Sequence, residues 1–319
     1  MRPWCHISQA RQHLDSILFI QLLNGLQLGI LLFLLSAGLT LTFGIMDFVN
    51  LAHGSFYMLG AFFCASLTLA TGSFWLGVLI ALPLTALAGY IVEKLVIQHL
   101  YRRDHLEHVL ATFGLILCID TLAHLFWGPA GIAVPLPQVL NGRVELFSGV
   151  EFPTFRLLII GTGCLIALGL YIMVSHTRVG MLIRAGASNR TMVSALGVDI
   201  KALFSAVFAL GATLAGVAGM LIAPITEASI GMGNDIIITT FVVIIIGGIG
   251  SMKGAFLAAL LIGLIDTIGR SFLDDFFKVL MSSEAAETAA PAVSAMLIYI
   301  LMAIVLAVRP QGLFPPSSR

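Results

Sequence analysis

Two long apolar runs that meet at a glycine-rich break constrain this chain more than any other stretch. The segment 242–266 has the sequence GGIGS at 247–251, and Lys253 follows it directly. The two runs together are long enough to cross a bilayer twice, because one crossing takes about 20 apolar residues. Lipid tolerates irregular backbone only where protein or water satisfies its polar groups. The break is therefore predicted to line a cavity or to pack inside a helix bundle.

A weaker echo of this pattern lies near the start of the chain, at 44–62. Both stretches place a Gly-Ser pair, at 54–55 and 250–251, shortly before a Gly-Ala-Phe triplet, at 60–62 and 254–256. Interrupted helices at matching places in two halves of a membrane protein indicate a translocation pathway. The echo alone is equally consistent with a pair of ordinary glycine-rich packing turns.

Composition sets the class of protein. The chain has 319 residues, of which 59% are hydrophobic and only 10% are charged, whereas about 25% are charged in soluble proteins. We therefore expect a protein embedded in a lipid bilayer. The formal net charge is zero, which does not favour a nucleic-acid partner. The four cysteines follow neither a disulfide framework nor a metal-binding spacing.

The apolar runs predict an all-α, polytopic membrane helix bundle. We expect about eight to ten transmembrane or half-spanning helices, with broken helices near the pathway. The run at 236–246 is rich in β-branched residues, but a helix is predicted because open sheet edges do not occur in lipid. The other predicted spans are 17–43, 53–70, 74–97, 109–128, 155–175, 203–223, the second run of the 242–266 stretch and 292–308.

Charge in the connections predicts the orientation and the domain boundaries. Basic residues gather at 1–11, 94–103, 178–201 and Arg309, and such segments are typically cytoplasmic. A single transmembrane domain, 17–309, is thus expected between a polar cytoplasmic segment, 1–16, and a cytoplasmic tail, 310–319. The loops 129–154, 224–235 and 270–290 are expected outside. Two cytoplasmic ends require an even number of crossings, so a half-crossing before Asn50, within 38–70, is predicted to restore the parity.

Few ionisable residues fall within the predicted spans. Asp120 and His124 are four residues apart and share a helix face; they are read either as a site or as a structural polar pair. Glu93 and Lys94 end the third span, where long charged side chains reach toward the interface. Three histidines follow in a polar connector, but their spacing matches no metal motif, so no metal site is predicted.

The longest basic connection, 176–202, is predicted to lie along the cytoplasmic face. It carries Arg178, Arg184, Arg190 and Lys201 against the single acid Asp199. Good helix formers from Arg184 onward end at the glycine of Leu196-Gly197, a typical helix stop. A docking role is favoured over a simple topology loop.

No catalytic constellation is visible in the sequence. It contains no nucleophile paired with a base, no HExxH and no phosphate-binding GxxxxGK[ST] loop. The chain is therefore not expected to be an enzyme, to hydrolyse nucleotide or to bind a cofactor. The chain combines broken helices and a helical basic loop with no ATP-hydrolysing motif of its own. This combination indicates a permease that a separate ATPase drives.

Six segments carry a resemblance to a known family. In this order they resemble the inner-membrane permeases of bacterial branched-chain amino acid ABC transporters, in particular the H-type permeases. The chain departs from that family in two places. The glutamate often found in the coupling loop is replaced by the region of Thr191-Met192-Val193, and 1–16 is longer and more polar than the usual start. The six segments are 37–44, 49–61, 112–115, 184–199, 247–255 and 309–314.

The resemblance implies an ATP-driven importer of several subunits in the bacterial inner (plasma) membrane. This chain and a related second permease form the pore, two ABC ATPase subunits dock in the cytoplasm and use ATP, and a periplasmic solute-binding protein delivers the substrate. Branched-chain amino acids are the family's main substrates, while urea, short amides and aromatic acids stay open, as does the pairing of the two permeases. By position, the ATPase-coupling residues are Arg184, Ala185, Asn189, Ala195 and Gly197.

The two breaks supply the predicted substrate pathway. Polar side chains and exposed glycine backbone would hydrogen-bond a zwitterion without trapping it, since the binding protein supplies the selectivity. The rival hypothesis is a stand-alone, ion-coupled secondary transporter or channel for a small polar solute, with its own ion site at Asp120 or Asp266. The predicted pathway residues are Asn50, His53 and Ser55 from the first break and Gly248, Gly250 and Ser251 from the second.

Overall fold

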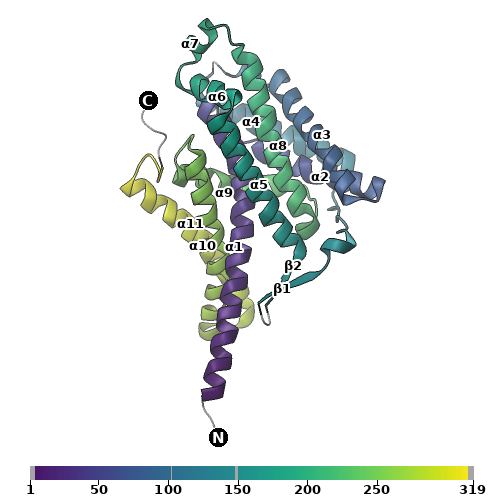
Figure 1. Ribbon diagram of the computed structural model, residues 1–319, viewed down its shortest axis with the longest axis vertical. Helices are drawn as coiled ribbons and strands as arrows, with labels where there is room; N and C mark the ends of the chain where they lie inside the picture. Colours follow the sequence, from purple (N-terminus) through teal and green to yellow (C-terminus); the bar gives the residue numbers. More distant parts are fainter. Residues whose placement is uncertain (1–3, 102, 148–149, 315–319) are drawn as a thin grey trace.

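The protein folds into an all-α bundle with one small β-hairpin (Figure 1). The computed structural model describes residues 4–101, 103–147 and 150–314. A hairpin of β1 (Arg143–Phe147) and β2 (Val150–Pro153) interrupts the predicted loop 129–154. The α-helices are α1 (Trp4–Met46), α2 (His53–Thr71), α3 (Phe74–Leu95), α4 (His105–Trp127), α5 (Thr154–His176), α6 (Arg178–Ser188), α7 (Arg190–Ala195), α8 (Ile200–Thr226), α9 (Met232–Gly247), α10 (Met252–Leu280) and α11 (Ser283–Val308), with short 3-10 turns at Ile97–His99 and Gln138–Leu140.

Within the described residues, eight helices are long and apolar enough to cross a membrane. The segment Ser16–Met46 of α1 is buried along most of its length, and α2 and α8 are also mostly buried. In contrast, less than a quarter of the apolar window is buried in α3, α4, α5 and α11, whose other residues are half-buried or exposed. Such exposure suits helices that face lipid, where apolar side chains lose nothing by contact with the acyl chains. The prediction of a polytopic helix bundle is confirmed.

Small residues let the inner helices approach one another closely. The sequence repeats Gly211, Ala215 and Gly219 at four-residue intervals, a spacing typical of close helix packing. The structure places this face inside the chain, since Gly211 packs against Gly38 of α1, and Gly219 against the Tyr57 backbone of α2. The repeat therefore builds the core of this subunit.

The predicted half-crossing within 38–70 is wrong. The helix α1 continues without a break to Met46, and the short element is α9, whose 16 residues span about 24 Å at 1.5 Å per residue. His53 Nε2 lies 3.0 Å from the Leu35 carbonyl oxygen. Leu35 precedes the end of α1 by about 16 Å along the axis, so the connection to α2 folds back into the bundle.

The two ends of the chain lie at opposite ends of the bundle (Figure 1). The end of α1 packs at Gly44 against Gly250, near the C-terminal segment that reaches Phe314, while α1 begins at the far end. The prediction places both ends on one side, whereas in the described residues the eight long helices and the shorter α9 together make nine traverses, an odd number. The basic segments α6 and α7 lie at the same end as the C-terminal segment. Residues 1–3 and 315–319 of the predicted terminal segments lie outside the described residues.

The prediction that 270–290 is a loop is wrong, because the segment is helical almost throughout. The helix α10 continues to Leu280, and α11 begins at Ser283. Ion pairs four residues apart stabilise the end of α10, with Lys278 Nζ 2.6 Å from Asp274 Oδ2. Polar composition suggested a loop, whereas these charges lie on exposed helix faces that extend beyond the apolar part of the bundle.

Candidate functional site

The second break forms one wall of a large groove. Residues 248–251 separate α9 from α10, and Gly250 has a φ of +82° that L side chains rarely adopt. The groove has a volume of about 1540 Å³ and is lined at this wall by Gly250, Ser251 and Lys253. Gly44, near the end of α1, and Asp47, the residue that follows this helix, also line the groove, and Gly44 packs against Gly250.

The groove combines both signs of charge with apolar walls. Asp47 supplies a carboxylate, and Arg184 of α6 and Lys253 of α10 supply cations. The Lys253 ammonium lies 5.9 Å from the centre of the Tyr171 ring, a distance at which cation–π attraction operates. The remaining walls are largely apolar and come from several elements, among them Phe33, Leu168, Phe256 and Leu257. Arg184 and Ser188 extend the groove to the predicted coupling segment.

Gly248 lies apart from this groove, under the C-terminal segment. The backbone N–H groups of Leu313 and Phe314 donate to the carbonyl oxygens of Ile246 and Gly247, at 2.8 and 3.1 Å. These bonds satisfy carbonyls that the end of α9 leaves without helical partners. Gly312 packs directly on Gly248, where a Cβ on residue 312 would meet the Gly248 Cα at 2.6 Å. The ending that contributed to the family resemblance thus caps α9.

The predicted pathway residues of the first break lie inside the bundle and, unlike Gly44 and Asp47, do not line the groove. Asn50, His53 and Ser55 are buried, with exposed fractions of 0%, 1% and 2%. Both polar side-chain atoms of Asn50 and the Ser55 hydroxyl lack a hydrogen-bond partner among the described residues. Buried polar atoms without hydrogen-bond partners destabilise the fold. The first break is therefore a part of the core where hydrogen bonding is incomplete. The two breaks approach each other through Gly44, whose Cβ position lies 3.2 Å from the Gly250 Cα.

Two helix starts also meet at the first break. Gly54 in the first turn of α2 contacts the backbone of Gly233 in the first turn of α9. Neither helix start has a side-chain cap. Since α2 and α9 both begin inside the bundle, the first break corresponds spatially to the start of α9, whereas the sequence echo paired it with the end of α9.

The predicted coupling loop contains two short helices, and the prediction of one helix from Arg184 to Gly197 is wrong in that respect. Arg184 and Ala185 belong to α6, which ends at Ser188. Asn189 separates the helices because its side-chain oxygen accepts a hydrogen bond from the Met192 N–H at 2.9 Å, which caps the start of α7. Ala195 ends α7, and Gly197 has a φ of +84° in open space. The predicted glycine stop is therefore confirmed.

Apolar side chains stand exposed on this same segment. Leu196 is 77% exposed and Met192 is 59% exposed. Both lie close in sequence to Asn189, Ala195 and Gly197, which are exposed as well. Exposed apolar residues among polar and basic neighbours are typical of a protein–protein contact. We name the exposed residues of 184–197 the coupling face.

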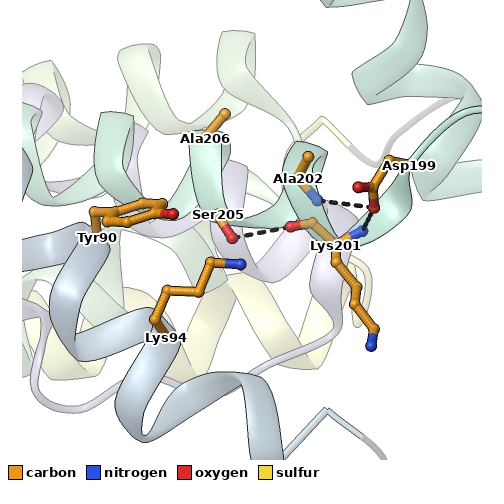
Figure 2. Close-up of a pocket in the computed structure, with 7 residues that line it drawn as sticks. All are labelled: Tyr90, Lys94, Asp199, Lys201, Ala202, Ser205 and Ala206. Atoms are coloured by element: carbon orange, nitrogen blue, oxygen red, sulfur yellow. Dashed lines mark hydrogen bonds between the residues drawn. The ribbon is translucent and has the colours of Figure 1, made fainter.

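Glu93 is buried, so the prediction that it reaches toward the interface is wrong. Its side chain is 0% exposed, and its carboxylate accepts hydrogen bonds from Tyr101 and Ser205, both at 2.6 Å. Only Lys94 behaves as predicted, since it lies partly exposed at a small pocket of about 450 Å³. Figure 2 shows Tyr90, Lys94 and Ser205 around that pocket, with Asp199 capping the start of α8 beside them.

The remaining acidic candidates have partners within the chain. Asp120 Oδ2 accepts a hydrogen bond from the Asn234 amide at 2.9 Å, which ties α4 to α9. The predicted pairing of Asp120 with His124 is thus replaced by a contact between helices. Asp266 pairs with Arg270 one turn further along α10, with Nε and Oδ2 3.0 Å apart. Both carboxylates therefore contribute to helix packing or to an ion pair.

Sequence comparison places the chain among transport proteins. The family described as "Branched-chain amino acid transport system / permease component" matches residues 21–306. The high-affinity branched-chain amino acid transport system permease protein LivH of Salmonella typhimurium is 26% identical over 309 residues, which cover 92% of this chain and 94% of LivH. BraD of Pseudomonas aeruginosa, described in the same words, is 29% identical over 81% of this chain and 88% of its own length.

A second kind of permease is also similar. The branched-chain amino acid permease protein LivM of Escherichia coli is 26% identical over 307 residues, which cover 88% of this chain and 67% of LivM. No solved structure gives a significant match to the chain.

Proposed function

The chain belongs to the family of branched-chain amino acid transport system permease components, and from this premise we propose that it moves branched-chain or related amino acids as a subunit of an ATP-driven importer. It is a multi-pass membrane protein with a permease fold. The proposed location is the bacterial inner (plasma) membrane, with the coupling face in the cytoplasm. Basic residues at that end of the bundle support this orientation.

The observation that carries the proposal is the groove that joins the second break to the coupling segment. The same groove is lined by Gly250 and Ser251 of the second break, by Asp47 and by Arg184 of the coupling segment. A zwitterionic amino acid needs a cation for its carboxylate, an anion for its ammonium group and an apolar surface for its side chain. The groove presents all three kinds of surface, and its open glycine backbone adds hydrogen-bonding groups.

The proposed mechanism is alternating access. ATP binding by partner subunits moves the coupling face, and the bundle opens to one side of the membrane or to the other. Asn50, His53 and Ser55 are proposed to line the pathway in the open states. The buried polar atoms of Asn50 and Ser55 have no partner among the described residues and would gain from contact with a polar solute, and His53, bonded to the Leu35 carbonyl, lies between them in sequence. Gly248 supports the second break from beneath, through its contact with the C-terminal segment.

The proposed partners follow the family resemblance. Two ABC ATPase subunits dock on the coupling face, a related second permease completes the pore, and a periplasmic solute-binding protein delivers substrate. The similarity to both LivH and LivM supports a pairing of two related permeases. The chain itself is proposed to bind no cofactor and to hydrolyse no ATP, which the partner ATPases use instead.

The test of the proposed function is reconstitution with the proposed partners, namely two ABC ATPase subunits, a second permease and a solute-binding protein. In proteoliposomes, ATP together with the binding protein is expected to drive uptake of radiolabelled leucine, and competition with urea, short amides and aromatic acids ranks the substrates. Uptake by the chain alone, without ATP, would favour the ion-coupled alternative. Asp120→Asn and Asp266→Asn would then identify its ion site.

Docking on the coupling face has its own prediction. Leu196→Glu places a charge on the most exposed apolar residue of the segment and is expected to release the ATPases, because a buried unpaired charge at an interface costs about 2–5 kcal/mol. The measurement is co-purification of the ATPases from mild detergent. Val139→Glu is the matched control, since Val139 is 86% exposed and belongs to the turn Gln138–Leu140 between α4 and β1, outside the coupling segment. Equal ATPase recovery with both variants would contradict this docking site.

A further inference from the structure

The buried carboxylate of Glu93 ties three elements together near the coupling face. Its Oε1 accepts a hydrogen bond from the Tyr101 hydroxyl in the connection between α3 and α4. Its Oε2 accepts one from the Ser205 hydroxyl of α8, and both distances are 2.6 Å. Lys94 Nζ lies 4.0 Å from the same Oε2. Each oxygen of one carboxylate therefore holds a different element in place.

A buried carboxylate needs hydrogen-bond donors in defined positions, which apolar packing between helices does not. Burying a carboxylate costs free energy unless donors satisfy both oxygens. The Tyr101 hydroxyl remains a donor over the ordinary pH range, because burial and the adjacent Glu93 raise the pKa of the phenol. Short charge-assisted hydrogen bonds are also strongly directional. The carboxylate thus fixes the position of the Tyr101 ring relative to α3 and α8.

The Tyr101 ring stands between two other aromatic rings. It packs edge-to-face on Phe204 of α8, with centroids 5.2 Å apart, and on Phe48, at 6.4 Å. Phe48 is fully buried in the first break, two residues before Asn50. Its far side packs against His108 of α4, at 4.4 Å. Tyr101 therefore forms an aromatic contact between Phe204 of α8 and Phe48 of the first break.

Phe204 in turn reaches the coupling segment. The guanidinium of Arg190, the first residue of α7, lies 5.4 Å from the Phe204 ring centre. A continuous path of contacts thus runs from Arg190 through Phe204 and Tyr101 to Phe48. Coupling between distant sites travels through packed networks of this kind when one element has two arrangements.

We propose that Glu93 is a positioning residue that holds Tyr101 between the coupling segment and the first break, so that movement of α7 reaches residues 47–52. This inference rests on the proposed function, because the movement comes from the docked ATPases. Glu93 itself touches neither substrate nor ATPase. Its role is to keep the aromatic path rigid while the segments at its two ends move.

The test separates ATP hydrolysis from transport. Tyr101→Phe keeps the ring and removes the hydroxyl, and Glu93→Gln keeps the shape and removes the charge. In the reconstituted importer, both variants are expected to assemble and to hydrolyse ATP within about twofold of the wild type, while leucine uptake falls about tenfold. The ATP consumed per leucine imported therefore rises about fivefold or more. Glu107→Gln, which alters an exposed glutamate paired with Arg103, is the matched control and leaves the ratio unchanged.

Three outcomes overturn the inference. One is a wild-type ratio in both Tyr101→Phe and Glu93→Gln, and another is a loss of hydrolysis and uptake in parallel, which marks a purely structural role. If Glu93→Gln fails to assemble, the ATP consumed per leucine imported is measured in Tyr101→Phe and Ser205→Ala instead, and a wild-type ratio in both overturns the inference. A wild-type importer without ATP-driven uptake removes the proposed function itself, and the inference with it.

Discussion

At the scale of single residues, glycines shape this protein through contact. Gly38, Gly60, Gly211 and Gly219 lie where inner helices touch backbone to backbone. Other helical glycines, such as Gly161 of α5, have no atom near the position of a Cβ. The same residue type therefore has opposite roles on the buried and the exposed helices, and only the contacts distinguish them.

The glycine contacts lead to a paired prediction. Gly219→Ala is expected to destabilise the protein by about 1–3 kcal/mol, because the new Cβ would lie 2.9 Å from the Tyr57 carbonyl carbon and closer to its oxygen. Gly161→Ala is expected to leave stability unchanged or to raise it by up to about 1 kcal/mol, since alanine favours helix. Thermal unfolding of the detergent-purified variants measures both. Equal shifts of the unfolding temperature in the two variants would show that helix propensity outweighs the contact between Gly219 and the Tyr57 backbone.

At the scale of elements, the C-terminal segment completes the broken helix pair α9 and α10. The hydrogen bonds from Leu313 and Phe314 satisfy the last carbonyls of α9, which then ends at Gly247 beside the groove. Ser251 caps the start of α10 by accepting a hydrogen bond from the Gly254 N–H at 3.2 Å. The irregular backbone of the second break is therefore held from both ends, as irregular backbone at membrane depth requires.

The capping by the C-terminal segment is tested at Gly312. Gly312→Ala is expected to lower the unfolding temperature and leucine uptake together, because a Cβ there meets Gly248 Cα at 2.6 Å and Ile245 O at 2.8 Å. Gly72→Ala is the control for backbone strain, since Gly72 has a similar φ, +68° against +82°, and no atom within 4 Å. That strain alone costs about 1–2 kcal/mol. An equal loss in the two variants would argue against capping.

At the scale of the whole molecule, an odd number of traverses sets the two ends of the chain on opposite sides. The bundle begins with α1 at one end and closes with the C-terminal segment at the other (Figure 1). The basic coupling segment shares the end of the C-terminal segment, which the positive-inside rule assigns to the cytoplasm. In the proposed orientation, the β-hairpin and the N-terminal end of α1 lie on the outer side.

Sidedness is measured by cysteine labelling. In a chain whose four cysteines are replaced by alanine, Val139→Cys is expected to react with an impermeant maleimide on intact spheroplasts, whereas Leu196→Cys reacts only in inverted vesicles. Both side chains are highly exposed, at 86% and 77%, so access depends on the side alone. A periplasmic reporter fused at the N-terminus is expected to be active. Labelling of both cysteines from one side would refute this orientation.

The sequence by itself determined the class, the helices and the glycine break. Apolar runs of about 20 residues have few stable forms in lipid other than helices. Glycine at 197, 248 and 250 permits the positive φ that the structure shows there. The basic connection and the six family segments were equally visible, because these signals are contained in short stretches of chain.

Only the tertiary structure decided which polar residues are buried, where α9 begins and on which side the chain starts. Glu93 and Lys94 are adjacent and alike in hydropathy, yet one is buried because Ser205, 112 residues away, supplies its partner. Likewise, Asp120 pairs with Asn234 across 114 residues. Hydropathy is a property of a stretch, whereas burial and pairing depend on contacts between distant stretches. The groove and the path through Tyr101 exist only because the fold brings those stretches together.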